Sequence, residues 1–381
     1  MSDSPIEVNT IIIGAGPAGL SVGACLKQAG IQAVILEQSD KVGSVWRGHY
    51  DRLHLHTDKR NSELPFESFP KDYPRYPSRD QLIDYLDSYA KKFDLDIQFN
   101  QQVKSARRDN NNQWEVQTQD VQYLASNLVI AAGNAREKFI PKWKGQDSFA
   151  GKIIHSSEYK NGEEFKGQNV LVVGFGNSGG EIAIDLFEHG AKPSISVRSA
   201  VNVIPRELFG IPILSIGIVQ NVMPAWMADA MNKPILRAVI GDITKYGLRK
   251  LPYGPATQIQ NDKHIPLIDV GTIKLIKQGH ITVHSGVEEF RENRVKFTDG
   301  KEANFDSVIL ATGYRPRVNE FLNEANVQDE NGTPESSGCE ASVSGLYFCG
   351  YYVSPTGMLR EIAIEAKQIA AAIVKKSKLG V

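Results

Sequence analysis

Two short apolar runs, each ended by a glycine-rich turn, dominate the pattern of the chain. Val8 to Ile13 and Val170 to Val173 are mostly apolar, as in strands that are buried on both faces of a parallel sheet. Helical periodicity follows each run, and a second short apolar run follows each helix. Each set therefore predicts one β-α-β unit of about 30 residues. The predicted helix and second strand lie at 17–29 and 33–36 in the first unit, and at 178–189 and 194–197 in the second.

The turns of both units carry the spacing of a dinucleotide fingerprint. They read Gly14-Ala-Gly16-Pro-Ala-Gly19 and Gly174-Phe-Gly176-Asn-Ser-Gly179. In such a turn the first glycine permits the tight bend, the second lets the backbone approach a pyrophosphate, and the third lets the helix pack on the strand. The phosphates then face the helix N-terminus. A single match is weak, but here each one lies between a predicted strand and helix, which is the required context.

The residue that ends the second strand of each unit distinguishes the two ligands. Glu37 follows Gly19 by 18 positions and is placed to accept hydrogen bonds from ribose hydroxyls, which suits FAD. The matching place in the second unit holds Arg198 and Ser199. A cation and a hydroxyl suit a 2′-phosphate, so we predict NADPH rather than NADH there. The alternative is that Arg198 is only a solvated residue at the strand end.

The remaining pattern extends the two units into a nested architecture. Residues 42–78 form a long connection, and connections of this length are usually functional. We predict an α/β fold of two nested Rossmann-like dinucleotide-binding domains. An FAD domain comprises residues 1–165 and 316–381, and an NADPH domain comprises residues 166–315. Further helices are predicted at 79–93 and 360–375, and further strands at 128–132, 281–284, 294–298, 307–314 and 345–350.

The NADPH domain contains an apolar helical insertion at about 205–250. Leu208 to Ala228 has 21 residues without a charge, but its prolines and glycines make a poor lipid-exposed helix. We therefore predict no transmembrane segment. We interpret the insertion first as a local core or a homodimer surface. The second interpretation is a wall of a substrate tunnel, and the third is a peripheral membrane contact. Its composition gives a bias only toward hydrophobic substrates.

Composition narrows the functional class. The net charge of the 381 residues is −1, which gives no electrostatic reason to expect a nucleic acid partner. Three cysteines without a C-x-x-C pair argue against a disulfide framework and a dithiol reductase, and indicate a cytoplasmic location. The polar N-terminus has no signal-peptide pattern. His49, His54 and His56 lack a further ligand set, so we predict no metal site and expect structural or flavin-contacting histidines.

An ordered set of motifs resembles the flavin-containing monooxygenases, and the YUCCA-type branch in particular. Phe149-Ala-Gly-Lys-Ile-Ile-His155 with Tyr159 is similar to the F-x-G-x-x-x-H-x-x-x-[YF] fingerprint of that family, and Leu310-Ala-Thr-Gly-Tyr314 is similar to its A-T-G-Y element. Their order relative to the two dinucleotide turns is also that of the family. Tyr50-Asp-Arg-Leu-His-Leu-His56 and Ile268-Asp-Val-Gly271 look similar to segments of the YUCCA branch. His155 could equally brace the join between domains.

The resemblance implies that NADPH reduces FAD and that the reduced flavin and O2 form a C4a-(hydro)peroxide, which oxygenates a small hydrophobic substrate. The cofactor supplies this chemistry, and the protein supplies orientation and water exclusion. The predicted FAD-binding residues are Gly14, Gly16, Pro17, Ala18, Gly19, Glu37, Gln38, Val45, Trp46, His56, Val103, Ala132, Gly133 and Gly350. The predicted NADPH-binding residues are Gly174, Gly176, Asn177, Ser178, Gly179, Arg198 and Ser199.

One departure from the family concerns the predicted catalytic residues, His56 and Asn177. Many members of the family have an Asn before a Thr in the loop after the Trp, where the Asn supports the peroxyflavin, and the local match here is His56-Thr57. The alternatives to a monooxygenase are an NADPH oxidase or flavin reductase that releases H2O2, and a non-catalytic redox-sensing flavoprotein. S- or N-oxidation, Baeyer–Villiger oxidation and decarboxylation of an α-keto acid all stay open.

Overall fold

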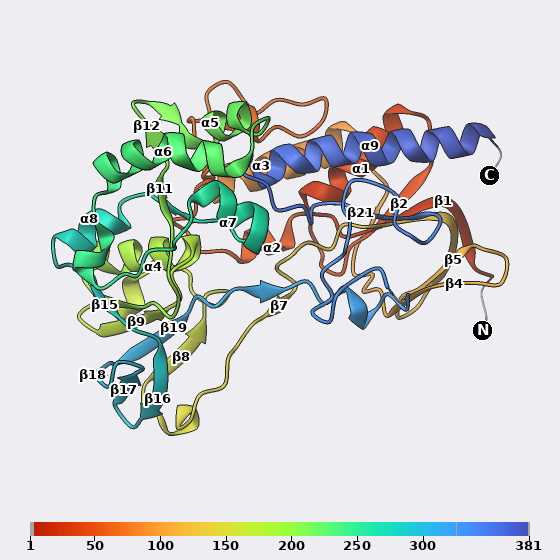
Figure 1. Cartoon of the computed structure of the whole chain (residues 1–381). Coiled ribbons are helices and arrows are strands. Elements are labelled where there is room, and N and C mark those ends of the chain that lie inside the picture. Colours follow the sequence, from red (N-terminus) through yellow and green to blue (C-terminus); the bar gives the residue numbers. More distant parts are fainter. Residues whose placement is uncertain (1–3, 325, 380–381) are drawn as a thin grey trace.

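The computed structural model describes residues 4–324 and 326–379, and its two largest sheets are each built around one of the glycine-rich turns (Figure 1). The first sheet has the order β3-β2-β1-β6-β5-β4, and β21 also pairs with β6. Their bounds are β1 Ile6–Ile13, β2 Ala33–Leu36, β3 Ile97–Gln98, β4 Ser105–Arg108, β5 Trp114–Gln117, β6 Gln122–Ile130 and β21 Leu346–Phe348.

Parallel pairing in the first sheet brings several strand ends to one edge. Ile13 of β1 pairs with Leu36 of β2 and with Ile130 of β6, so the turns that follow these three strands lie together. Helix α1 (Pro17–Gln28) begins at the first glycine turn, and the long helix α9 (Met358–Leu379) packs beside it. Helix α3 (Arg79–Lys92) begins with a capping box between Ser78 and Gln81.

The second sheet is wholly parallel, with the order β15-β10-β9-β19-β8. Helix α4 (Asn177–Glu188) follows β9 and begins at the second glycine turn. Strand β8 lies N-terminal to residue 165, yet it pairs with β19 in this sheet. An antiparallel meander of β16, β17 and β18 adjoins the sheet. The bounds are β8 Lys152–His155, β9 Asn169–Val173, β10 Lys192–Ser196, β15 Thr282–His284, β16 Val287–Arg291, β17 Arg294–Phe297, β18 Glu302–Asn304 and β19 Ser307–Leu310.

The chain passes between the two halves through a short antiparallel pair of strands. Strand β7 (Glu137–Lys138) pairs with β20 (Tyr314–Arg315), and Figure 1 shows β7 between the two sheets. The remaining short elements are α2 Ser44–Gly48, α8 Thr272–Lys277 and the 3₁₀ turns Lys59–Asn61, Gln146–Ser148, Glu163–Phe165, Ile243–Tyr246 and Val318–Glu320.

The apolar insertion folds as short strands and helices on the second half of the molecule. The strands and α-helices within the predicted 205–250 are β12 Glu207–Leu208, β13 Ile211–Pro212, α5 Ile213–Gln220 and α6 Ala225–Ile240, and those that flank it are β11 Val203–Pro205, α7 Pro255–Asp262 and β14 Leu267–Asp269. Ile204, Leu208, Ile213, Leu214 and Ile268 form a local core, whereas many other large apolar side chains of the segment are exposed, so the choice among the predicted roles of the insertion stays open. Within the described residues, no helix has the length and apolar character needed to span a bilayer.

Candidate functional site

The first glycine turn has a backbone that only glycine accommodates at two positions and an open position between them. Gly14 has φ +106°, and a Cβ there would lie 2.6 Å from the carbonyl oxygen of Ala131. A Cβ at Gly19 would overlap the carbonyl oxygen of Gly14. Gly16, in contrast, has no atom within 4 Å of its Cβ position. The middle glycine therefore borders open space at the N-terminus of α1, where a diphosphate fits.

The second turn repeats this geometry at the N-terminus of α4. Gly174 has φ +116°, and a Cβ at Gly179 would overlap the carbonyl oxygen of Gly174. Gly176 again has no atom within 4 Å of its Cβ position. Two turns of the same shape, each at the end of a parallel strand and the start of a helix, are suited to two dinucleotides.

Glu37 lies at the end of β2, beside the first turn. It is 4% exposed, and its Oε2 accepts a hydrogen bond of 2.8 Å from the backbone N–H of Ala15 within the turn. Its Oε1 accepts from the backbone and hydroxyl of Ser39 at 3.0 and 2.8 Å. These bonds fix the carboxylate at the strand end where a ribose would be recognised.

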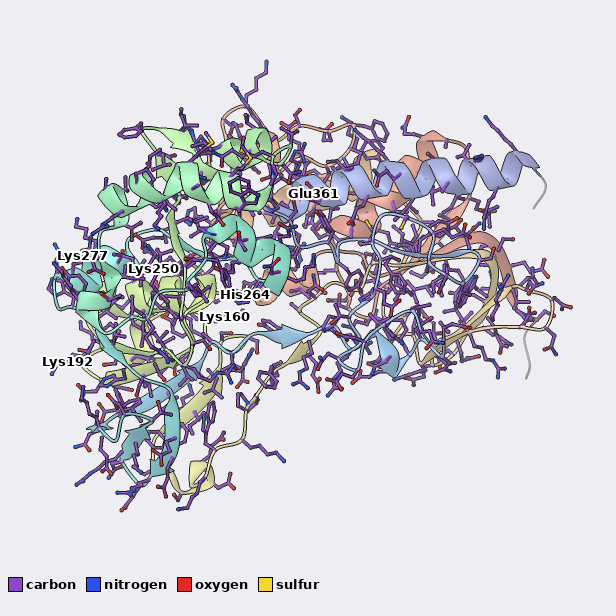
Figure 2. All side chains as sticks on the ribbon, in the orientation of Figure 1. Lys160, Lys192, Lys250, His264, Lys277 and Glu361 are labelled. Atoms are coloured by element: carbon purple, nitrogen blue, oxygen red, sulfur yellow. The ribbon has the colours of Figure 1, made fainter. Side chains whose placement is uncertain are left out.

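The equivalent position in the second half is strongly cationic. Arg198 and Ser199 are exposed after β10, and the Arg249 guanidinium donates a hydrogen bond to the Arg198 carbonyl oxygen. Lys250 is the next residue and is exposed; it is labelled in Figure 2 on the half of the molecule that contains the second sheet. Sequence reasoning missed Arg249 and Lys250 because 50 residues of insertion separate them from Arg198. Three cations at this strand end suit a phosphate.

The other predicted FAD-binding residues differ in exposure. Pro17, Ala18, Val103 and Gly350 are buried; Trp46, Ala132 and Gly133 are half-buried; Val45 and Gln38 are exposed. Val103 packs in the core beneath the first sheet. Gly350 donates its backbone N–H to Glu365 of α9 at 2.6 Å, and a Cβ at Gly350 would lie 3.2 Å from the Ala18 Cβ. The structure thus brings Gly350 to the start of α1.

Asn177 and Ser178 occupy the first turn of α4 and are half-buried. The Asn177 Oδ1 accepts a hydrogen bond of 2.8 Å from the backbone N–H of Ile268 in β14. This bond ties the start of α4 to the strand that carries the Ile268-Asp-Val-Gly271 segment. The side-chain carbonyl of Asn177 therefore has a positioning role in this structure.

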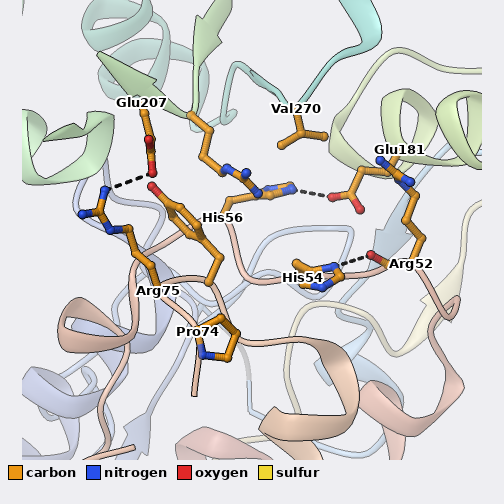
Figure 3. Close-up of a pocket in the computed structure, with 10 residues that line it drawn as sticks. Arg52, His54, His56, Pro74, Arg75, Glu181, Glu207 and Val270 are labelled. Atoms are coloured by element: carbon orange, nitrogen blue, oxygen red, sulfur yellow. Dashed lines mark hydrogen bonds and ion pairs between the residues drawn. The ribbon is translucent and has the colours of Figure 1, made fainter. Parts of the chain in front are cut away.

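A cleft of about 570 Å³ lies between the segment after α2 and the second half of the molecule (Figure 3). The Nε2 of His56, from that segment, is in hydrogen-bonding contact with the Oε1 of Glu181 in α4. Both side chains are largely buried. The residues that line the cleft are Arg52, His54, His56, Pro74, Arg75, Tyr76, Glu181, Arg206, Glu207 and Val270.

Arginines dominate the charge of this cleft. Arg52 forms an ion pair with Glu188, and Arg75 forms one with Glu207 at 3.2 Å. Arg206 lies 4.2 Å from the centre of the Tyr76 ring, and within the described residues no carboxylate forms an ion pair with it. A half-buried guanidinium stacked on an aromatic ring keeps its hydrogen-bond donors available for a planar anion. Sequence reasoning found neither Glu181 nor Arg206, although an acidic residue within the apolar face of α4 was a visible signal.

The segment that carries His56 is anchored in the second half. Tyr50 is 1% exposed and packs in the core of that half, with its ring 6.5 Å from that of Tyr159. The backbone N–H of Asp51 donates to the carbonyl oxygen of Lys160 at 2.9 Å. His49 is half-buried nearby, and this partial burial lowers its pKa, with the charges of Lys160 and Arg79 adding to the effect.

His155 joins two of the motifs identified in the sequence. Its Nε2 lies 3.1 Å from the carbonyl oxygen of Gly313, and its Nδ1 accepts the backbone N–H of Ser157 at 3.2 Å. A neutral ring that donates through Nε2 satisfies both bonds. Burial lowers the pKa of His155, which favours this neutral form. His155 thus connects β8 to the Ala-Thr-Gly-Tyr turn after β19.

The two buried cysteines, Cys25 and Cys349, fit a structural role. Burial raises the pKa of Cys25 to about 11 and that of Cys349 well above its ordinary value, and neither thiol is paired. Thiols with raised pKa values are poor nucleophiles.

Comparisons with known proteins agree with this geometry. Residues 8–333 match the family described as flavin-binding monooxygenase-like. The chain is 39% identical to the indole-3-pyruvate monooxygenase YUCCA6 of Arabidopsis thaliana over 382 residues, which covers 97% of this chain and 91% of the relative. The fold is similar to that of a flavin-containing monooxygenase from Stenotrophomonas maltophilia, with 22% identity, a TM-score of 0.73, and coverage of 98% and 99% of the two chains.

A second solved structure of similar fold is that of cyclohexanone monooxygenase from Rhodococcus sp. Phi1 bound to NADP+. It has a TM-score of 0.75 and 19% identity, and the match covers 98% of this chain and 85% of that one. The family match extends through both glycine turns and the cleft between them. The chain therefore belongs to the flavin-binding monooxygenase-like family, whose typical cofactors are FAD and NADPH.

Proposed function

We propose that this protein is an NADPH-dependent FAD monooxygenase that oxidatively decarboxylates an apolar α-keto acid. The observation that carries the proposal is the cleft, where Arg206 presents a guanidinium without a carboxylate partner among the described residues, beside the ring of Tyr76. The carboxylate of the substrate would form an ion pair with the guanidinium of Arg206. The name of the relative from Arabidopsis, an indole-3-pyruvate monooxygenase, supports the same substrate class.

The residues of both glycine turns fit their cofactors. We propose that the open positions at Gly16 and Gly176 receive the diphosphates of FAD and NADPH. Glu37 would bind the FAD ribose, and Arg198, supported by Arg249, would bind the 2′-phosphate of NADPH. When bound, FAD accepts a hydride from NADPH and activates O2. We further propose that the chain crosses from one domain to the other at β7 and returns at β20. Strand β8 would then belong to the NADPH domain, where it pairs with β19.

The proposed reaction balances without a further reactant. One α-keto acid, O2, NADPH and a proton give the carboxylic acid shortened by one carbon, CO2, NADP+ and water. In this reaction the chain itself orients the substrate through Arg206. The contact between the His56 Nε2 and the Glu181 carboxylate holds the imidazole in the cleft between the halves.

The test is substrate-dependent turnover of the purified flavoprotein. Indole-3-pyruvate and phenylpyruvate should accelerate NADPH and O2 consumption, with one equivalent of CO2 and of the shortened acid per NADPH. A thioether and cyclohexanone serve as controls for S-oxidation and Baeyer–Villiger oxidation. NADPH consumption that releases stoichiometric H2O2 with every substrate would refute the proposal. That result would instead favour an NADPH oxidase. This alternative is consistent with the presence of His56 at the position where many members of the family have an Asn.

We also propose a cytoplasmic location for the protein, which the unpaired cysteines support.

A further inference from the structure

The helical insertion presents an unusually large exposed apolar surface. Phe209 and Val222 are each 91% exposed, and Trp226 is 68% exposed. Nine large apolar side chains of the insertion are each at least 39% exposed, and large groups of exposed apolar side chains mark interaction sites. We call this set the insertion face. It consists of Phe209, Ile211, Val219, Val222, Trp226, Met227, Met231, Ile235 and Val239.

The insertion face is held in place by polar contacts on its inner side. Asp229 of α6 accepts the backbone N–H groups of Ala256 and Thr257 at 2.8 and 3.0 Å, at the N-terminus of α7. Asn232 of α6 and Gln220 of α5 exchange hydrogen bonds of 2.8 and 3.2 Å through their side-chain amides. These contacts turn the polar groups inward, so the outward arc of α6 is left to apolar side chains.

Helical geometry places cations along one flank of that arc. At about 100° per residue, the exposed side chains of Met227, Met231, Ile235 and Val239 lie on one arc of α6 together with Ala238 and Pro234. Lys233 and Arg237 lie one turn apart on the same side as Trp226. Both cations are exposed. From residue 208 to residue 241 the single acidic residue is Asp229, which accepts the two backbone N–H groups of α7 described above. The exposed Asp242 follows directly. Hydrogen bonds from Thr244 lower the Asp242 pKa, and Arg237 lies near enough for that cation to help lower it.

The charge pattern distinguishes between two occupants of this face. A second copy in a twofold dimer presents the same patch, in which the cations Lys233 and Arg237 outnumber the one flanking exposed carboxylate, Asp242, so cations would face cations across the contact. A bilayer with anionic headgroups meets the cations and receives the apolar arc at the same time. A helix of 16 residues is about 24 Å long, and it lies along the surface without spanning the bilayer.

The insertion face also adjoins the candidate active site. On its inner side α5 contacts the segment after His56, where the Asn61 Nδ2 lies 3.3 Å from the Ser215 Oγ. Arg206 of the cleft directly precedes β12, which leads into Phe209. A bilayer bound at the insertion face would therefore lie close to the substrate cleft.

We propose that the insertion face docks the protein reversibly onto an anionic lipid bilayer, with α6 lying in the headgroup plane. This inference is independent of the substrate proposed above. It makes the third of the predicted roles of the insertion, the peripheral membrane contact, its main role.

Vesicle flotation of the flavin-loaded full chain tests the proposal. Vesicles of phosphatidylcholine with phosphatidylserine should carry the protein, and vesicles of phosphatidylcholine alone should carry less. The double variant Lys233→Glu/Arg237→Glu should lower the partition coefficient by roughly 30-fold or more, because each cation near an anionic surface contributes about 1 kcal/mol. Val222→Ser/Trp226→Ser should also abolish flotation. The matched control is Ile140→Ser, which removes an apolar side chain of 42% exposure outside the insertion face.

Retained flavin absorbance and an unchanged thermal midpoint would show that the variants are folded. No flotation of the wild-type chain with anionic vesicles would overturn the proposal. A concentration-dependent dimer in sedimentation velocity that Val222→Ser/Trp226→Ser dissociates would identify a second copy as the occupant. Equal flotation of the wild-type chain and both variants would also overturn it, because binding would then reside elsewhere.

Discussion

Replacement of the middle glycine of each fingerprint should separate the two cofactors from one another and from folding. Gly16 and Gly176 have φ values of −83° and −93° with extended ψ, a region that valine adopts readily. Neither Cβ position has an atom within 4 Å. We therefore expect Gly16→Val and Gly176→Val to change the free energy of unfolding of the apoprotein by no more than about 1 kcal/mol.

The same open space is where each diphosphate must lie against the backbone, so the added side chain should exclude it. We expect Gly176→Val to weaken NADPH binding at least ~100-fold, which corresponds to about 2.7 kcal/mol, while flavin content stays at the wild-type level. Gly16→Val should yield protein purified without flavin. Flavin absorbance, titration with NADPH and thermal unfolding measure the three quantities.

Gly179→Ala is the contrasting control, because its Cβ overlaps the Gly174 carbonyl oxygen. We expect this variant to lose at least about 1–3 kcal/mol of stability through overpacking of the backbone. Wild-type affinity for NADPH in Gly176→Val, or full flavin loading in Gly16→Val, would refute the assignment of the two turns. A large loss of apoprotein stability in either variant would refute the argument from open space.

Three further outcomes can be measured. Arg198→Ala should raise the KM for NADPH at least ~10-fold and leave the KM for NADH nearly unchanged, because only NADPH offers a 2′-phosphate; equal effects would contradict the phosphate assignment. Arg206→Gln should raise the KM for an α-keto acid ~10- to 100-fold while substrate-free NADPH oxidation persists, and Arg206→Lys should recover part of the loss; an unchanged KM would remove Arg206 from substrate binding. The pKa of His155 is lower in the folded than in the unfolded chain, so its contribution to stability is present above pH ~6.5 and is lost as the pH falls toward the folded pKa. Between neutral and mildly acidic pH, the free energy of unfolding measured with denaturant should therefore fall less for His155→Asn than for the wild-type chain. An equal fall in both proteins would contradict the role of His155.

The local pattern was sufficient to predict the elements that carry the glycine turns. The first predicted helix, 17–29, is α1 Pro17–Gln28, and the second, 178–189, is α4 Asn177–Glu188. These elements depend on an apolar run, a glycine and helical periodicity, which are all local. The family and the fold class were also predicted correctly, because the motifs and their order extend through most of the chain.

Contacts between distant segments could not be read from the sequence. Strand β8 joins the second sheet through β19, which lies more than 150 residues further along the chain. The approach of Glu181 to His56 likewise depends on how the two halves pack. Apolar composition could not separate a buried from an exposed insertion, because burial depends on what covers the segment. The assignments of Asn177 and His56 as catalytic, and the individual cofactor contacts, stay predictions.

The anchoring of Tyr50 links the motion of one cofactor domain to the surroundings of the other. Trp46 of α2 packs against the core of the first half, but Tyr50, four residues later, is locked in the core of the second. Any rotation of the second half must therefore pull on the short stretch between these two aromatic residues. His56 lies further along the same segment and contacts Glu181 of α4. If NADPH binds the second half and FAD the first, as proposed, movement of the second half on nucleotide binding would be transmitted through this segment to the FAD site.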